Sequence, residues 1–118
     1  MRDDAVYLEY IIECIEMVEE YLGGTAARDE ELFLGDLRTQ DAVLRRMEIL
    51  ADAASHLSSE LRARHPDVDW RKAIDFRNVL AHAYMEIQLS LVWETITDDL
   101  PLLKAVAQEE LGQLDGSD

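Results

Sequence analysis

Residues 7–22 repeat apolar side chains at steps of three and four, the spacing of one face of an α-helix. The apolar positions of this stretch are Tyr7, Tyr10, Ile11, Cys14, Ile15, Val18, Tyr21 and Leu22. Glutamates fill much of the opposite face. Asp3 or Asp4 is the expected N-cap, because a carboxylate there can accept hydrogen bonds from the free N–H groups of the first turn. The pair Gly23-Gly24 is expected to end the helix.

Residues 25–37 are predicted to form a connector, with one short helical turn over residues 29–34. A second helix is predicted from near Thr39. Its apolar stripe consists of Val43, Met47, Leu50, Ala54, Leu57 and Leu61. His65-Pro66 should close this helix, because the residue before a proline is pushed out of the helical region. In that position His65 is expected to face solvent.

A third helix is predicted after Asp67 or Asp69, either of which can serve as its cap. Its apolar positions are Trp70, Ala73, Ile74, Val79 and Leu80. A break is expected within residues 83–87, and a fourth helix from about Gln88. Pro101 either kinks this last helix or begins a new segment, with Asp98 as the cap.

These elements predict an all-α protein, an antiparallel bundle of four to five helices. A single domain is expected over residues 1–118, with a frayed polar tail from 112 to 118. One cysteine cannot form an intramolecular disulfide, so Cys14 is expected to be a buried small residue in a reducing compartment. The sequence shows no N-terminal signal and no apolar run near the ~20 residues that span a bilayer. We therefore expect a cytoplasmic protein without a membrane partner.

The formal net charge of −15 argues against a general affinity for nucleic acid. The charge is unevenly distributed, however. Residues 38–84 hold eight basic and seven acidic side chains, whereas the segments on either side are strongly acidic. Most of the acids are expected to be solvated helix faces. The basic residues of this middle segment include Arg45, Arg46, Arg71 and Lys72.

Residues 77–84 carry the candidate chemistry. Asn78 and His82 are four residues apart and share a helix face, so the amide could orient the imidazole. Arg77 and His82 lie about 140° apart around an ideal helix, so they converge only if the helix breaks near His82 or two copies meet across a two-fold axis. A guanidinium can grip a phosphate and stabilise developing charge. An imidazole can move the proton of a 2′-hydroxyl or of a leaving 5′-oxygen.

The spacing of Arg77, His82 and Tyr84 resembles the Arg-x4-His-x-Tyr motif of the HEPN toxins of the HepT group. The surrounding sequence is similar too. The opening segment, with its Asp-x-x-Tyr-Leu-Glu-Tyr-Ile pattern, resembles that family's first helix. The other matching stretches are residues 38–46, 62–66, 69–70, 91–93 and 99–101.

The resemblance implies a dimeric, metal-independent endoribonuclease toxin without a cofactor, whose cleft is formed by the motif helices of both subunits. Arg77 and His82 would be the catalytic pair acting on RNA, and Asn78 a polar helper that orients them. The candidate RNA contacts would be Arg45, Arg46, Arg71 and Lys72. In such toxin pairs a nucleotidyltransferase-fold antitoxin of the MntA type transfers AMP to the motif tyrosine. That role would fall on Tyr84.

Two positions depart from the family pattern. Family members often carry glycine before the motif arginine and after the motif histidine, where this chain has Phe76 and Ala83. Alanine disfavours a left-handed turn, so one outcome is that the helix continues past His82. The departures lend weight to a second interpretation, a non-catalytic helical dimer that binds a nucleotidyltransferase partner or a nucleotide. A third, a purely structural bundle, would leave the Arg/Asn/His/Tyr set unexplained.

Overall fold

The computed structural model describes residues 2–23 and 29–116, and this part of the chain contains helices and no strands. In chain order the helices are α1 (Arg2–Tyr21), α2 (Glu30–Leu34), α3 (Leu37–Ser55), α4 (Ser59–Ala63), α5 (Trp70–Ala81), α6 (Glu86–Asp98) and α7 (Leu100–Gly116). The all-α bundle predicted from the sequence is confirmed. Five of these helices are long, and α2 and α4 are short connectors of five residues each.

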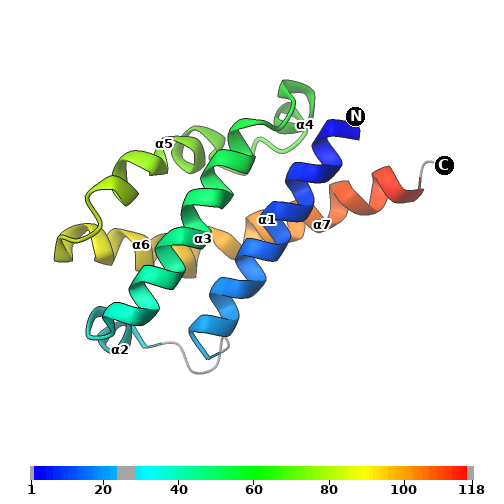
Figure 1. Cartoon of the computed structure of the whole chain (residues 1–118). Helices are drawn as coiled ribbons and strands as arrows, with labels where there is room; N and C mark the ends of the chain where they lie inside the picture. Colours follow the sequence, from blue (N-terminus) through cyan, green and yellow to red (C-terminus); the bar gives the residue numbers. More distant parts are fainter. Residues whose placement is uncertain (1, 24–28, 117–118) are drawn as a thin grey trace.

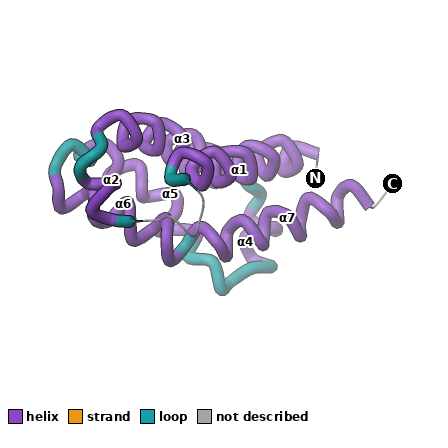
Figure 2. Tube along the Cα trace, turned by 90° about the horizontal axis from the view of Figure 1, so that it is seen from below, coloured by secondary structure: helices purple, strands orange, loops and turns teal. Residues whose placement is uncertain are grey.

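The long helices pack as an elongated bundle of 47 × 27 × 21 Å. Helix α1 lies beside α3 and also packs against α7, while the other side of α3 packs against α5 (Figure 1). Seen from below, α1 and α3 form one layer, and α6 and α7 run beneath it (Figure 2). The start of α1 and the end of α7 lie at the same end of the molecule. Helix α5, which carries the candidate motif, therefore has α3 as its principal support.

The core is built from the apolar stripes that the sequence predicts. The side chains with at most 1% exposure include Leu8, Ile11, Cys14, Ile15, Val18, Val43, Met47, Leu61, Val92 and Ile96. Removing this apolar surface from water is the main force that holds the helices together. Tyr10 belongs to the predicted stripe of α1 but remains half-exposed. Cys14 is buried as expected, and this burial raises the pKa of its thiol.

Helix α1 begins at Arg2, so neither Asp3 nor Asp4 is its N-cap. The Asp4 side chain is instead buried and accepts two hydrogen bonds from Ser58, from the backbone N–H at 2.8 Å and from the hydroxyl at 2.7 Å. At its other end α1 stops where predicted, with Gly23 in the left-handed region at φ 76°. Gly24 lies outside the described residues. The predicted short turn is also confirmed as α2, capped by Asp29.

The single helix predicted from Thr39 to His65 is wrong, because the structure divides it into α3 and α4. Ser58 separates the two as the N-cap of α4, and its hydroxyl oxygen accepts from the backbone N–H of Leu61 at 3.2 Å. The same hydroxyl donates to Asp4, which lies 54 positions earlier in the chain. The break is thus fixed by a long-range contact that periodicity within the segment does not reveal.

Pro101 lies at the start of a new helix and does not kink a continuous one. Helix α6 ends at Asp98 and α7 begins at Leu100, so Pro101 lies in the first turn of a new helix, where a missing N–H costs little. Asp98 is the last residue of α6 rather than a cap. Helix α7 continues to Gly116, beyond residue 112 where the frayed tail is expected, and residues 117–118 lie outside the described part. No helix in the described part is long and apolar enough to cross a membrane.

Candidate active site

Helix α5 is held at its start by a cap and on one side by the core. Of the two predicted caps, the structure uses Asp69, whose carboxylate accepts from the backbone N–H of Lys72 at 3.0 Å. Phe76 and Leu80, four residues apart, point into the core with 5% and 9% exposure. A helix that buries this face must turn the neighbouring positions outward. The motif residue Arg77 is accordingly exposed.

The helix ends at the motif histidine. His82 is the C-cap of α5, with φ −116° and ψ 20°, and its backbone N–H donates to the carbonyl of Val79 at 3.2 Å. The carbonyl of His82 accepts from the N–H of Met85 at 3.1 Å, which closes a tight turn before α6 begins at Glu86. The break predicted within residues 83–87 is therefore confirmed, beginning one residue earlier. The alternative outcome, a helix that continues past His82, is wrong.

Ala83 makes this turn without the glycine that the family pattern places there. Its backbone N–H donates to the carbonyl of Leu80 at 3.2 Å, and its side chain is 2% exposed. No non-glycine residue in the described ranges has a positive φ. The chain thus leaves the helix without a positive φ, through conformations that alanine tolerates, and the alanine methyl group is buried in the core.

Arg77 and Asn78 line an open groove between α5 and α3. Ala81 continues the α5 wall. The α3 wall consists of Arg45, Glu48, Ile49 and Asp52, which follow one another at helical spacing. Of the four candidate RNA contacts, only Arg45 shares this groove with the motif arginine. The groove combines two guanidinium groups, which suit a phosphate, with a small apolar surface at Ile49 and Ala81.

His82 and Tyr84 lie in the turn beyond the groove. Both side chains are exposed, Tyr84 to 81%. Their rings meet edge to face, with centroids 6.5 Å apart. Within the described residues no hydrogen bond joins His82 to Asn78 or to Arg77. One copy of the chain thus places Arg77 in the groove with Asn78 and Arg45. It places His82 beside Tyr84 in the following turn, without a contact between these two groups of residues in the described ranges.

Two carboxylates, those of Glu48 and Asp52, reduce the positive charge of the groove. The guanidinium of Arg45 donates a hydrogen bond to the Glu48 carboxylate at 3.2 Å and forms an ion pair with it, and Asp52 lies 3.7 Å from the imidazole of His56. The His56 ring also stacks on Tyr7 at 4.8 Å, so this histidine continues the α3 edge of the groove toward α1. These four side chains are all at least half exposed, so water screens their interactions. The helical spacing of Glu48 and Asp52 from Arg45 is the sequence signal that places these acids on the same face of α3.

The other three candidate RNA contacts lie on different faces. Arg46 turns toward α1, where its guanidinium contacts the sulfur of Met17 at 3.8 Å. Arg71 is almost fully exposed and lies 3.8 Å from Asp75. Lys72 reaches the opposite side of α5, where it forms an ion pair with Asp99 at 2.6 Å, and this contact raises the pKa of its ammonium. Basic residues that are close in sequence are therefore not one basic patch.

His65 also differs from its prediction, because it is mostly buried rather than solvent-facing. Its imidazole lies 2.6 Å from the carboxylate of Glu110, which also accepts from Arg64 at 2.7 Å. The pKa of Glu110 is lowered, mainly by the hydrogen bond from Arg64 and to a smaller extent by the one with His65. Burial of the carboxylate acts in the opposite direction and raises the pKa. This cluster ties the connector between α4 and α5 to α7. It positions the start of α5 from outside the candidate site.

The arrangement of helices is that of an all-α, HEPN-like bundle. Within residues 2–23 and 29–116, no three His, Cys, Asp or Glu side chains are grouped so that they could hold a metal ion. The family model described as Ribonuclease HepT-like matches residues 11–110. The chain therefore belongs to the HepT-like ribonuclease family.

Curated relatives agree with the family model. A probable ribonuclease HepT from Thermococcus cleftensis is 37% identical over 103 residues, which cover 87% of this chain and 91% of the relative. A putative RNase from Caldanaerobacter subterraneus is 31% identical over 94% of this chain and 96% of its own length. A gamma-glutamylcyclotransferase and putative RNase from Methanocaldococcus jannaschii is 34% identical over 97% of this chain, which spans only 50% of that longer protein. No solved structure matches significantly.

Proposed function

We propose that this protein is a metal-independent endoribonuclease in which Arg77 and His82 form the catalytic pair and Asn78 is a positioning residue. The observation that carries the proposal is the end of α5 at the motif histidine, which leaves Arg77, His82 and Tyr84 all accessible to a large substrate. Membership of the HepT-like ribonuclease family supports the same activity.

The chemistry needs only side chains that this site presents. The imidazole of His82 accepts the proton of a ribose 2′-hydroxyl as that oxygen attacks the adjacent phosphorus. The bond from phosphorus to the 5′-oxygen then breaks, and the proton passes to that leaving oxygen. Arg77 stabilises the charge that gathers on the phosphate oxygens during the exchange. The products are a cyclic 2′,3′-phosphate and a free 5′-hydroxyl, and no metal ion takes part.

A second copy of the chain would complete the site. Arg77 lies at the groove and His82 in the following turn, without a contact between them in the described residues. A two-fold axis near this turn would place His82 of one copy opposite Arg77 of the other. Exposed apolar side chains at Tyr84, Met85 and Leu91 support an interface there. We therefore propose a homodimer with a shared cleft.

RNA is proposed to enter along the groove beside Arg77. Arg45 would contact a phosphate next to the one that is cleaved, since it lines the same groove from α3. Arg46, Arg71 and Lys72 would lie outside this path, because they point to other faces and Lys72 is already paired with Asp99. The strongly acidic remainder of the protein leaves little general attraction for RNA, so capture depends on this local contact.

The same site accommodates the toxin–antitoxin role that the family resemblance implies. Tyr84 is 81% exposed and its ring lies beside His82, so a partner enzyme could reach its hydroxyl. AMP transferred to Tyr84 by a nucleotidyltransferase-fold antitoxin would add a bulky anion next to the catalytic pair. That anion would exclude and repel an RNA phosphate.

Growth tests the toxin role. Expression of the chain alone in a bacterial host should arrest growth, His82→Ala should relieve the arrest, and co-expression with the cognate nucleotidyltransferase should also relieve it. Glu109→Ala, which replaces an exposed side chain on α7 away from the groove, is the control and should arrest growth like the wild type. If His82→Ala is as toxic as the wild type at equal protein levels, the catalytic assignment is wrong. The non-catalytic binding dimer would then be the better account.

A further inference from the structure

A shallow basin lies between α4 and α5, outside the groove that holds Arg77. Ala63 of α4 and Trp70 and Ile74 of α5 give the basin an apolar surface, and Arg62 lines it from α4. Its volume is about 510 Å³, and it shares no lining residue with the groove. Ligand sites typically have volumes of roughly 300–1,000 Å³, so the basin has room for one nucleoside.

The basin and the groove lie along one face of α5. Trp70, Ile74, Arg77 and Ala81 follow one another at steps of four, three and four, the spacing of a single stripe on a helix. Trp70 and Ile74 line the basin, while Arg77 and Ala81 line the groove. The rise of the helix from Trp70 to Arg77 is about 10 Å. A strand that is bound at Arg77 and runs toward the start of α5 therefore reaches the basin.

The indole of Trp70 is a fixed aromatic surface in the basin. Its N–H donates to the carbonyl of His65 at 2.9 Å, and the ring is half-buried against the core. The fold thus sets the orientation of this ring before any ligand binds. An aromatic side chain can stack with each of the four bases, because every base has a π-face.

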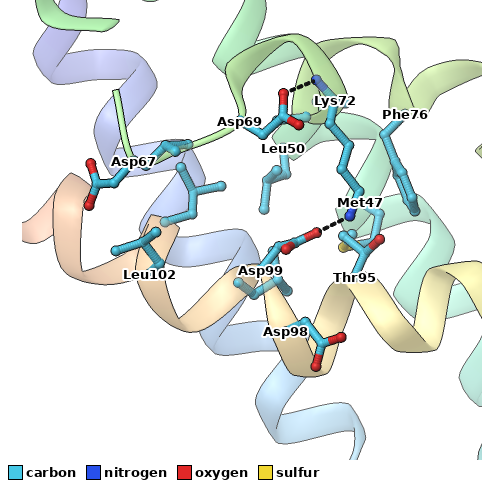
Figure 3. A pocket seen from close by; sticks show the side chains of 15 residues that line it. Met47, Leu50, Asp67, Asp69, Lys72, Phe76, Thr95, Asp98, Asp99 and Leu102 are labelled. Carbon is cyan, nitrogen blue, oxygen red and sulfur yellow. Dashed lines mark hydrogen bonds and ion pairs between the residues drawn. The ribbon is translucent and has the colours of Figure 1, made fainter. Parts of the chain in front are cut away.

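Arg62 carries a positive charge that the fold leaves unpaired. Within the described residues its guanidinium forms no ion pair, and its buried Nε has no hydrogen-bond partner. Neighbouring bases are engaged, since Arg64 binds Glu110 at 2.7 Å. Lys72, on another face of α5, binds Asp99 at 2.6 Å (Figure 3).

A phosphate would satisfy the Arg62 guanidinium. A buried donor without an acceptor is costly, and a phosphate oxygen would remove this cost. Nε and an adjacent Nη of one guanidinium can donate together to two phosphate oxygens. A small rotation of the side chain is enough to turn Nε toward the basin, because no polar contact in the described residues holds it.

The remaining charges of the basin offset each other. Arg71 also lines it, but this guanidinium lies 3.8 Å from the carboxylate of Asp75. Arg62 is therefore the net positive charge of the basin, in a chain whose formal net charge is −15. Such a site favours an anionic strand over a cation.

We propose that the basin is a second RNA subsite, which holds a nucleotide neighbouring those bound at Arg77. The base lies against Trp70 and Ile74, and Arg62 binds its phosphate. The identity of the ligand rests on the proposed ribonuclease function, because an RNA that is cleaved at Arg77 must continue along the surface of α5.

Binding of an RNA analogue that cannot be cleaved tests the subsite apart from catalysis. The probe is a fluorescein-labelled, single-stranded 2′-O-methyl RNA of mixed sequence and about ten nucleotides, a length within the site sizes of single-strand binders. Its methylated 2′-oxygen cannot attack phosphorus. In fluorescence anisotropy the full-length wild type should bind it saturably, with an affinity that falls as salt is added.

Two variants of the basin should weaken this binding. Arg62→Gln removes the phosphate contact, so Kd should rise about tenfold at low salt and the salt slope should become smaller by ~0.7. Ala63→Glu places a negative charge at an exposed position of the basin and should weaken binding by a similar factor. This second variant keeps the test decisive if Arg62→Gln does not fold.

Matched controls make the same changes of charge on α7. Lys104→Gln removes a positive charge and Ala105→Glu adds a negative one, at positions that line neither the basin nor the groove. Both variants should bind the analogue like the wild type.

The two tryptophans report where the strand lies. In NMR spectra the indole N–H resonance of Trp70 should shift as the analogue saturates the protein. The indole resonance of Trp93, whose ring lies 5.5 Å from that of Phe33, should stay unchanged.

Cleavage separates a failure of the subsite from a failure of the proposed function. On an ordinary RNA of the same length Arg62→Gln should raise KM with little change in kcat. A dinucleotide is too short to reach the basin and should be cleaved as by the wild type. A wild type that binds the analogue through the basin but cleaves no RNA would remove the ribonuclease proposal and support the subsite.

Four results would overturn the subsite. The wild type could fail to bind the analogue saturably, or folded Arg62→Gln and Ala63→Glu could bind it as tightly as the wild type. The α7 controls could lose as much affinity as the basin variants, which would mean that only net charge matters. The Trp70 resonance could also remain unmoved at saturation.

Discussion

The rings of His82 and Tyr84 meet edge to face, with centroids 6.5 Å apart, in the turn that follows α5. The turn begins because α5 ends at Ala81, and it is fixed by the side chain of Ala83, which is buried in the core. The relationship places the proposed general base and the proposed modification site side by side on an exposed corner of the molecule. A group attached to Tyr84 would therefore occupy the space that RNA must enter.

Modification at Tyr84 is the first prediction. After co-expression with the cognate nucleotidyltransferase, intact-mass measurement should show one or more AMP additions, and Tyr84→Phe should lose them. Tyr10→Phe is the matched control, because the Tyr10 side chain is also exposed, to 50%, but lies on α1. The prediction fails if the wild type gains no mass, or if Tyr84→Phe is modified to the same extent as Tyr10→Phe.

The second prediction concerns the acid in the groove. Glu48→Gln removes a negative charge beside Arg45, so RNA cleavage at low salt should become a few-fold faster. The gain should shrink as salt is added, since the Debye length falls from ~10 Å at 0.1 M to ~3 Å at 1 M. Glu109→Gln makes the same change in net charge on α7 and should leave the rate unchanged. Equal acceleration by both variants would show that the groove is not the RNA path.

Most of the fold could be predicted because most helix boundaries depend on nearby residues. Gly23 ends α1 and Asp29 begins α2 as the sequence indicates. The break between α3 and α4 could not be predicted, since it depends on Ser58 meeting Asp4 across the bundle. The buried position of His65 has the same kind of cause, a contact with Glu110 on the last helix.

The candidate site was only partly predictable for a related reason. The spacing of Arg77 and His82 indicates that a break or a second copy is needed, and the break is present at His82. Which basic residues accompany Arg77 depends on how α3 is rotated against α5. That rotation selects Arg45 and turns Arg46 toward α1, which residue spacing within one helix does not determine.

Acid should destabilise the protein through Glu110, which is the third prediction. The Arg64 hydrogen bond holds the pKa of this buried carboxyl below its ordinary value of 4.5. Its contribution to stability is therefore fully present above pH 4.5 and is lost as the pH falls through the lower folded value. Urea unfolding should show a free energy of unfolding that falls with pH below 4.5.

The matched variant for this pH dependence is Glu110→Gln, which keeps the shape but cannot ionise. It should unfold more easily at neutral pH and show a smaller loss of stability below pH 4.5. Some loss will remain, because hydrogen bonds from Thr39 also lower the pKa of Asp36. An identical pH dependence in wild type and Glu110→Gln would contradict the assignment.

The fourth prediction addresses the position where the family often has glycine. Ala83→Gly removes a methyl group that is 2% exposed and adds backbone freedom to the unfolded chain. Both effects lower stability, by about 1 kcal/mol in total. Urea denaturation measures this loss directly. A gain in stability would mean that the turn is strained by its alanine.

The most direct test of the central claim is cleavage of a labelled RNA by purified, unmodified protein in the presence of a chelator. The wild type should cleave, and Arg77→Ala and His82→Ala should each lose most of that activity while remaining folded by circular dichroism. Products ending in a cyclic 2′,3′-phosphate would match the proposed chemistry. A folded, unmodified wild type that leaves RNA intact, or a His82→Ala variant that cleaves at the wild-type rate, would contradict it.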